Sequence, residues 1–123
     1  MRISQSIEAP IEKVWDILTD TRQWPLWGPS VSAVDCAQRY ISAGATGRVK
    51  TVIGIWASFQ IIRFEPPYYW NWQVAGAPAT GHRLEPVGSG RCELVFEMPA
   101  LAFPYTLVCR RALNNITRLA CRG

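Results

Sequence analysis

The stretch that decides the fold runs from Pro104 to Cys121 and reads PYTLVCRRALNNITRLAC. Its apolar residues recur with the period of an α-helix and form one wide stripe. Pro104 suits the first helical position, where a missing backbone N–H costs nothing. The stripe needs an apolar partner, and the preceding chain consists mostly of strand-like runs. The pattern therefore predicts a C-terminal helix wrapped by a sheet. The stripe consists of Tyr105, Val108, Cys109, Ala112, Leu113, Ile116, Leu119 and Ala120.

Two short helical segments are predicted near the start of the chain. Residues 2–8 alternate between apolar and polar side chains, which indicates a first strand. Pro10 ends this strand, and apolar residues then recur at helical spacing from Ile11 to Leu18. The polar run at 19–21 ends this helix. Residues 24–29, WPLWGP, contain two prolines and one glycine, so they predict an aromatic turn or a short helix followed by a turn.

The middle of the chain is predicted to be a series of strands. They are joined by short turns, such as Gly88-Ser89-Gly90, and by one loop at 38–47. Consecutive strands with short connections form an antiparallel sheet, and segregated helices make the fold class α+β. The six predicted strands are Val31 to Cys36, Arg48 to Ile55, Ala57 to Glu65, Tyr68 to Ala75, Thr80 to Pro86 and Arg91 to Met98.

Composition excludes several classes of function. A chain of 123 residues predicts one domain, 1–123. The net charge of +4 comes from scattered arginines, which indicates a mildly basic surface and no nucleic-acid partner. We expect no membrane span and no secretory signal. Four cysteines without CxxC spacing and a single histidine predict no metal site, and reduced thiols in a cytoplasmic protein. No motif for a nucleotide is present, so we expect no cofactor.

The opening motifs carry a resemblance to a known family. Ala9-Pro10 precedes IEKVWDILTD at 11–20, and WPLWGPS follows at 24–30. This closely resembles the START-like (SRPBCC) superfamily, in particular its polyketide cyclase/dehydratase-type members. Later pieces agree with the resemblance: Gly44 and Gly47, Pro66-Pro67, His82-Arg83-Leu84, Gly88-Ser89-Gly90-Arg91, and the segment from Arg111 to Leu119.

The resemblance implies a helix-grip fold. A curved antiparallel sheet of about seven strands would wrap the long C-terminal helix, and two short helices between strands 1 and 2 would close one end. Such folds usually keep a cavity for an apolar small molecule between sheet and helix. Members of the superfamily include lipid-transfer domains, plant-hormone receptors and aromatase/cyclases.

Strand alternation predicts which side chains face the helix. Leu84 points inward, so Thr80 and His82 share its face, and the apolar set Trp70, Trp72 and Val74 faces the same way. Tyr69, Asn71 and Gln73 then face solvent. In residues 57–65 the register stays open, since Ile62 and Phe64 compete with Phe59 and Ile61 for the inner face. The remaining inward residues are Val49, Thr51, Ile53, Cys92, Leu94 and Phe96.

His82 is the only histidine and the most informative polar candidate. It is either an anchor or general acid–base group on the cavity wall, or a hydrogen-bonded core histidine. Cys109 on the helix stripe is either a nucleophile paired with His82 or a small buried hydrophobe. Arg63 is a polar anchor only if its strand turns it inward. The predicted ligand-binding set is Trp70, Trp72, His82, Leu84, Leu94, Phe96, Phe59, Tyr105 and Cys109.

The tryptophans have two interpretations. Trp70 and Trp72 form a flat wall for a ring-shaped ligand, or they fill the core. Trp15, Trp24 and Trp27 are interpreted as structural residues that pin the two helices to the end of the sheet. Trp27 has a second possible role, as a gate at the cavity mouth.

Three functions remain open at this stage. The preferred one is binding of an apolar or aromatic, lipid- or polyketide-like small molecule by a monomer or homodimer. The alternative is a polyketide cyclase/dehydratase-type enzyme in which His82 moves a proton. The third is a protein-interaction module with a collapsed cavity and an exposed apolar patch at Tyr68, Tyr69 or residues 100–103.

Overall fold

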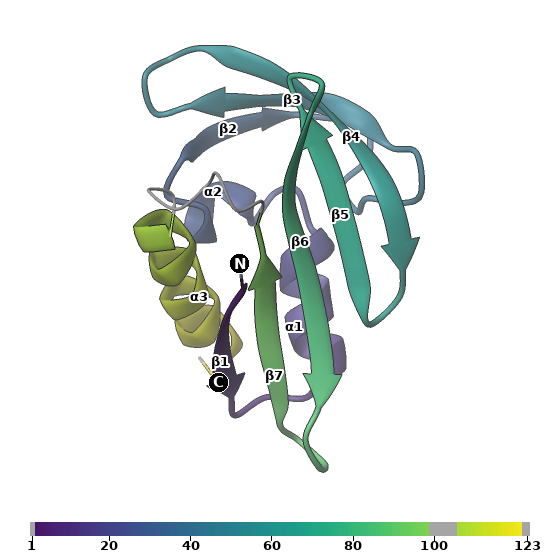
Figure 1. Cartoon of the computed structure of the whole chain (residues 1–123), viewed down its shortest axis with the longest axis vertical. Helices are drawn as coiled ribbons and strands as arrows, with labels where there is room; N and C mark the ends of the chain where they lie inside the picture. Colours follow the sequence, from purple (N-terminus) through teal and green to yellow (C-terminus); the bar gives the residue numbers. More distant parts are fainter. Residues whose placement is uncertain (1, 99–105, 122–123) are drawn as a thin grey trace.

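The computed structural model describes residues 2–98 and 106–121 (Figure 1). One antiparallel sheet has seven strands in the order β1-β7-β6-β5-β4-β3-β2. The predicted α+β helix-grip class is confirmed. The strands are β1 Arg2–Ile7, β2 Val31–Asp35, β3 Thr46–Thr51, β4 Trp56–Glu65, β5 Tyr69–Val74, β6 Ala77–Pro86 and β7 Cys92–Glu97, and the helices are α1 Ile11–Thr19, α2 Trp24–Trp27 and α3 Thr106–Ala120.

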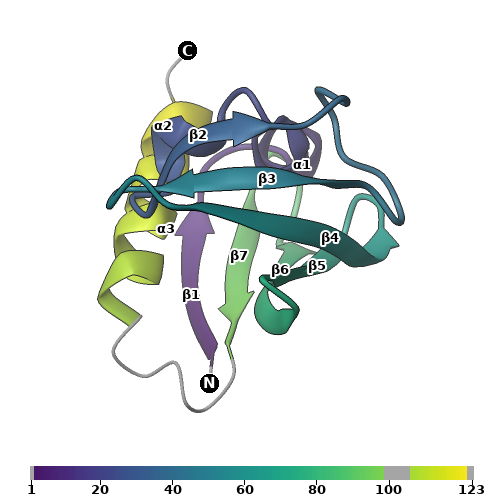
Figure 2. The same ribbon diagram turned by 90° about the horizontal axis from the view of Figure 1, so that it is seen from above.

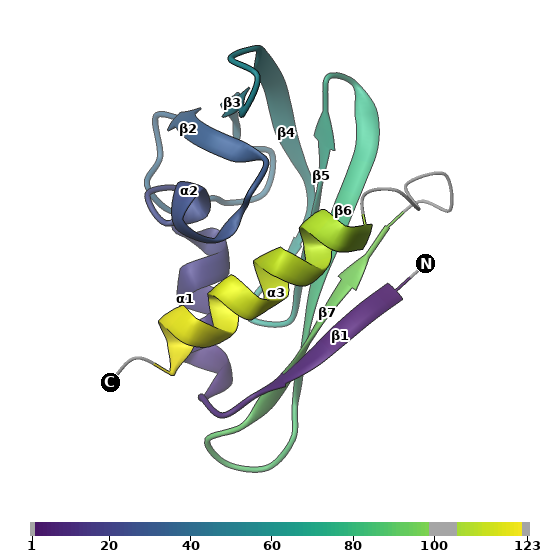
Figure 3. The ribbon, with the colours of Figure 1, turned by 90° about the vertical axis from the view of Figure 1, so that its left-hand side faces the viewer.

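The sheet bends around α3, with α1 and α2 beside the helix (Figures 2 and 3). Two side-chain hydrogen bonds fix the helix in place. Gln5 Nε2 on β1 donates to Thr117 Oγ1 over 2.7 Å, and Asn115 Nδ2 donates to the carbonyl oxygen of Trp27 over 3.1 Å. The apolar stripe is buried at Cys109, Ala112, Leu113, Ile116 and Ala120. Pro104 and Tyr105, at the predicted start of this helix, lie outside the described residues.

A buried carboxylate holds the end of α1 against the loop that precedes β3. Asp20 is fully buried and accepts hydrogen bonds from Arg39 Nε and Nη2 at 3.2 and 3.0 Å, from Gln23 Nε2 and from the Arg22 backbone N–H. Burial alone would raise the pKa of the Asp20 carboxyl, but these hydrogen bonds and the Arg39 charge outweigh it and lower the pKa. Thr19-Asp20-Thr21 therefore ends the helix as predicted and also anchors the loop.

A β-bulge settles the register that alternation left open in β4. Phe59 and Ile61 are buried, and the pairing of β4 with β5 shifts between Ile61 and Arg63. The extra residue, Ile62, is exposed, and the parity of the strand changes after it. Phe64 therefore faces inward as well, where its ring lies 5.5 Å from that of Trp15. Of the competing sets, Phe59 and Ile61 both face inward, whereas of Ile62 and Phe64 only Phe64 does.

The prediction that Ile53 faces the core is wrong. β3 ends at Thr51, and Ile53 lies in the turn to β4 with 76% of its surface exposed. The Thr51 hydroxyl accepts a hydrogen bond from the Ile55 N–H at 3.3 Å, and Gly54 adopts the left-handed conformation with φ 85°. These two features close the turn before a longer strand can form.

Tyr69 lies on the outer face of the sheet, yet its ring is buried, contrary to the prediction. The guanidinium groups of Arg63 and Arg83 lie 4.9 and 4.4 Å from the ring centroid. A Cβ atom at Gly81 would lie 2.7 Å from the Tyr69 hydroxyl oxygen, so the ring packs directly on the glycine. Arg63 consequently lies over the outer face and is not an inward anchor.

The β5–β6 turn places an alanine in the left-handed region. Ala75 and Gly76 have φ of 53° and 78°, as in a two-residue hairpin turn of type I′. Because asparagine tolerates this conformation better than alanine, we expect Ala75→Asn to raise the free energy of unfolding by about 0.5–1 kcal/mol. Urea unfolding measures the change. Ala77→Asn, at an exposed neighbour without positive φ, is the control; a comparable gain there would contradict the explanation.

Candidate functional site

Two adjoining chambers lie on the inner side of the sheet, and residues of α2 and α3 line only the inner one. The inner chamber has a volume of about 40 Å³ and the outer one about 330 Å³. They share Ser30, Val31, Trp72 and Thr80, so these residues lie where the two chambers meet, a junction that we call the passage. The rest of the inner wall is Trp24, Trp27, Gly28, Pro29, Trp70, His82, Phe96, Val108, Cys109 and Ala112, and the rest of the outer wall is Val49, Thr51, Val74, Pro78, Ala79 and Met98.

The two chambers differ in the size of the group that each can hold. A water molecule needs roughly 10–15 Å³ of such volume, so the inner chamber has room for about three water-sized groups. Small-molecule sites span roughly 300–1,000 Å³, and the outer chamber reaches the lower end of that range. An apolar ring or chain therefore fits the outer chamber, while the inner one accepts only a small terminal group.

An aromatic stack forms one wall of the inner chamber. Trp70 lies between Trp24, with ring centroids 5.7 Å apart, and His82, 3.9 Å apart. Sheet register explains the row, because Trp70 pairs with His82 across β5 and β6, and His82 pairs with Phe96 across β6 and β7. The Phe96 ring meets the imidazole edge-on at 5.1 Å. His82 is thus set among aromatic rings.

His82 is 2% exposed and neutral at physiological pH. Burial lowers the pKa of its imidazole to about 3, a shift that the hydrogen bond to the Trp70 carbonyl only partly opposes. Nδ1 lies 3.3 Å from this carbonyl oxygen, which can only accept, so Nδ1 carries the proton. Nε2 is then the acceptor of the ring. The group that orients the imidazole is therefore a backbone carbonyl.

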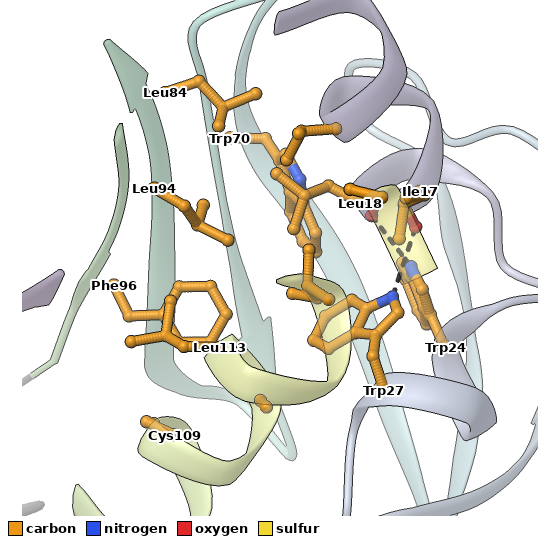
Figure 4. Close-up of a cluster of buried hydrophobic side chains, with 14 of the residues drawn as sticks. Ile17, Leu18, Trp24, Trp27, Trp70, Leu84, Leu94, Phe96, Cys109 and Leu113 are labelled. Atoms are coloured by element: carbon orange, nitrogen blue, oxygen red, sulfur yellow. Dashed lines mark hydrogen bonds between the residues drawn. The ribbon is translucent and has the colours of Figure 1, made fainter. Parts of the chain in front are cut away.

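Trp24 and Trp27 have structural roles: both tie the short helix α2 to α1, and Trp24 also stacks on Trp70 of the sheet, the kind of contact that was predicted. Trp24 Nε1 donates to the Leu18 carbonyl oxygen over 2.9 Å, and Trp27 Nε1 donates to that of Ile17 over 3.2 Å (Figure 4). The indole N–H groups of Trp70 and Trp72 are also buried, but no acceptor among the described residues lies within hydrogen-bonding distance of them. Among the described residues, Trp70 and Trp72 therefore have no indole hydrogen bond of the kind that holds Trp24 and Trp27.

Cys109 reaches the inner chamber from α3 (Figure 4). Burial raises the pKa of its thiol to about 11, so the sulfur stays protonated near neutral pH. Its environment is that of a small hydrophobe. The described residues contain no group of three or more His, Cys, Asp or Glu side chains placed to hold a metal ion.

Some residues of the predicted ligand-binding set line a chamber, and others pack in the core. Trp70, Trp72, His82, Phe96 and Cys109 line the inner chamber, and Trp72 lines both. Leu84, Leu94 and Phe59 are not among the lining residues of either chamber and pack in the core. Tyr105 lies outside the described residues.

Sequence reasoning did not assign the wall of the outer chamber. Val49, Thr51 and Val74 were predicted to face inward, and that parity was the available signal for them. Pro78 and Ala79 lie between two predicted strands, and no pattern in the sequence marks them as cavity residues. Met98 ends the predicted strand from Arg91, and its parity matches that of the inward residue Phe96. Ser30 and Val31 come directly after the WPLWGP motif. The motif predicts a turn, but it does not predict that the next two residues line a cavity.

Comparison with known proteins establishes the class. The chain belongs to the family described as polyketide cyclase / dehydrase and lipid transport, whose model matches residues 1–118. No curated protein matches the sequence significantly. None of the helices in residues 2–98 and 106–121 is both long and apolar enough to cross a membrane.

Three solved structures illustrate the shared fold. The protein MLL2253 from Mesorhizobium loti is 14% identical with a TM-score of 0.78, covering 100% of this chain and 97% of that one. The di-domain ARO/CYC StfQ from the steffimycin biosynthetic pathway is 16% identical with a TM-score of 0.77, covering 99% and 44%. DynU16, a protein from the dynemicin biosynthetic locus, is 21% identical with a TM-score of 0.68, covering 96% and 45%.

Proposed function

We propose that residues 1–123 form one domain that binds an apolar or aromatic small molecule, lipid- or polyketide-like, with its body in the outer chamber. The observation that carries the proposal is the chamber of about 330 Å³ with a wall of Val31, Val49, Trp72, Val74 and Met98. Burying an apolar ligand there contributes about 25 cal/mol per Å² before the cost of ordering. The family to which the chain belongs supports this class of ligand.

The inner chamber gives the ligand a polar end. Its small volume accepts one terminal group beyond the Thr80 passage, and His82 lies on its wall. Because Nδ1–H is bonded to the Trp70 carbonyl, Nε2 is available to accept a hydrogen bond from a ligand hydroxyl. We therefore expect a ligand with an apolar body and a hydroxyl or phenol at one end.

The second candidate is a cyclase-type enzyme. The family description and the likeness to StfQ favour it, since shape and orientation alone can guide a ring closure. Proton transfer by His82 is disfavoured, because an imidazole with a pKa of about 3 is a weak base near neutral pH. Binding is therefore placed first. The interaction module with a collapsed cavity is weakest, since the outer chamber is open.

Filling the passage between the chambers tests the proposal. We expect Thr80→Phe to weaken binding of the neutral apolar probe N-phenyl-1-naphthylamine at least about tenfold, because the added ring occupies ligand volume. Probe fluorescence titration measures the dissociation constant, and circular dichroism confirms folding. Ser58→Phe, at an exposed position of β4, is the control. Equal affinity in Thr80→Phe and the parent protein would place the ligand elsewhere.

A further inference from the structure

The turn between β3 and β4 carries a run of exposed apolar side chains. Val52, Ile53, Ile55 and Trp56 are between 41 and 76% exposed. The other large apolar residues that are exposed in the described part of the chain are isolated from one another in the sequence. Scattered exposed hydrophobic residues are ordinary, whereas a contiguous group marks a contact surface.

The turn is closed by its own hydrogen bonds, so it holds these side chains outward. The Thr51 N–H donates to the Ile55 carbonyl oxygen over 2.9 Å, and the Gly54 N–H donates to that of Thr51 over 2.9 Å. The Thr51 hydroxyl accepts from the Ile55 N–H as well. Because the N–H groups of Thr51, Gly54 and Ile55 are bonded inside the turn, the tip can enter an apolar medium without leaving these three donors unpaired.

The tip lies beside the outer chamber. Val49 and Thr51, the last inward residues of β3, line that chamber, and Val52 follows directly. In Figure 1 the β3–β4 hairpin projects at the opposite end of the molecule from the turn between β6 and β7. Whatever contacts the tip therefore lies close to the chamber.

Charge around the tip is basic. The basic residues nearest the tip are Lys50 and Arg48 of β3, and the sequence between Ile41 and Phe64 contains no acidic residue. Lys50 forms no ion pair with any described residue. Arg48 lies 5.1 Å from the Trp56 ring centroid and bonds Asp35 at 2.7 Å. An aliphatic tip with tryptophan and basic side chains behind it matches the depth profile of a membrane interface.

Geometry and area favour a lipid surface over a protein partner. A stable protein interface buries about 800 Å² on each partner, more than four side chains on one turn provide. We propose that the β3–β4 turn docks the chain on an anionic lipid surface. Val52, Ile53 and Ile55 enter the acyl boundary, and Trp56, Lys50 and Arg48 remain at the headgroups. The docking does not depend on the proposed ligand.

Sedimentation with vesicles tests this docking. We expect the protein to bind vesicles of equal parts phosphatidylcholine and phosphatidylserine, and to bind less as salt is raised. Ile53→Asp should lower the partition coefficient at least about tenfold, because a carboxylate replaces an inserted side chain. Lys50→Glu should lower it by roughly tenfold on the anionic vesicles only.

Val87→Asp is the matched control, since Val87 is an exposed apolar residue in the turn between β6 and β7. It should leave vesicle binding unchanged, and an equal loss there would overturn the proposal. Failure of the parent protein to bind the vesicles would overturn it too, as would a dimer that Ile53→Asp dissociates in analytical ultracentrifugation. Ile53→Asp should still bind N-phenyl-1-naphthylamine, and Thr80→Phe should still dock, so each proposal can fail alone.

Discussion

Replacing Trp24 by alanine is expected to lower the free energy of unfolding by about 4 kcal/mol. The buried indole stacks on Trp70, meets Trp72 edge-on at 5.3 Å, and lies 5.4 Å from Phe59. Truncation leaves a cavity among these rings and removes the donor from the Leu18 carbonyl oxygen. Because domains are stable by about 5–15 kcal/mol, this single change removes a large part of the total.

Urea unfolding followed by circular dichroism measures the effect. Trp24→Phe should lose less than Trp24→Ala, because it keeps most of the packing and loses mainly the hydrogen bond to Leu18. Trp56→Ala is the exposed control, and we expect a cost within about 1 kcal/mol. If Trp24→Ala were as mild as Trp56→Ala, the aromatic stack would not be what holds α2 against the sheet.

The ends of the chain were the most predictable part of the fold. The closing helix has a regular apolar period, and α1 combines such a period with a proline at its start and polar residues at its end. In both helices the local sequence signals and the burial in the folded protein favour the same structure. The two side-chain anchors of α3, Gln5 to Thr117 and Asn115 to Trp27, were beyond prediction. Each joins residues far apart in the sequence, and nothing local signals such a pairing.

The strand errors have physical causes. The run from Val49 to Ile55 alternates as a strand does, and Gly54 was its one local warning of a turn. A β-bulge such as that at Ile62 changes parity without a sequence signature, since it is set by pairing with β5. Tyr69 faces outward as its parity requires, but two arginines from β4 and β6 cover it. Exposure of a strand residue depends on neighbours that alternation does not describe.

The candidate site shows the same division. Parity placed Trp70, Trp72, His82 and Phe96 on one face, and they do share the inner chamber. The volume of each chamber, however, depends on how side chains from several strands pack together, which alternation along one strand does not predict. The rings that were predicted to line a cavity largely fill it, and the roomier space opens toward β3 and the start of β6. The sequence contains the residues of both chambers but not the difference in their sizes.

Stability is expected to fall by about 3 kcal/mol between pH 7 and pH 4 through His82 alone. In the unfolded chain the imidazole has its ordinary pKa of 6.5, whereas burial lowers the pKa to about 3 in the folded protein. Between pH 7 and pH 4 the imidazole is therefore protonated in the unfolded state but not in the folded state. The free energy of unfolding decreases as the pH falls. The pKa of Asp20 is lowered in the folded protein, so its own contribution to stability is lost as pH falls below about its ordinary value of 3.8, at the lower edge of this window.

The single histidine makes this test direct. Its imidazole C–H signals in NMR belong to His82 alone, and we expect them not to titrate in the folded protein between pH 7 and pH 5. Urea unfolding at several pH values then gives the loss of stability. His82→Phe keeps a ring against Trp70 without a titrating group, so its stability should vary much less over the same range. An ordinary titration near pH 6.5 in the folded state would mean that solvent reaches the ring, and His82 would regain its candidacy as a general base.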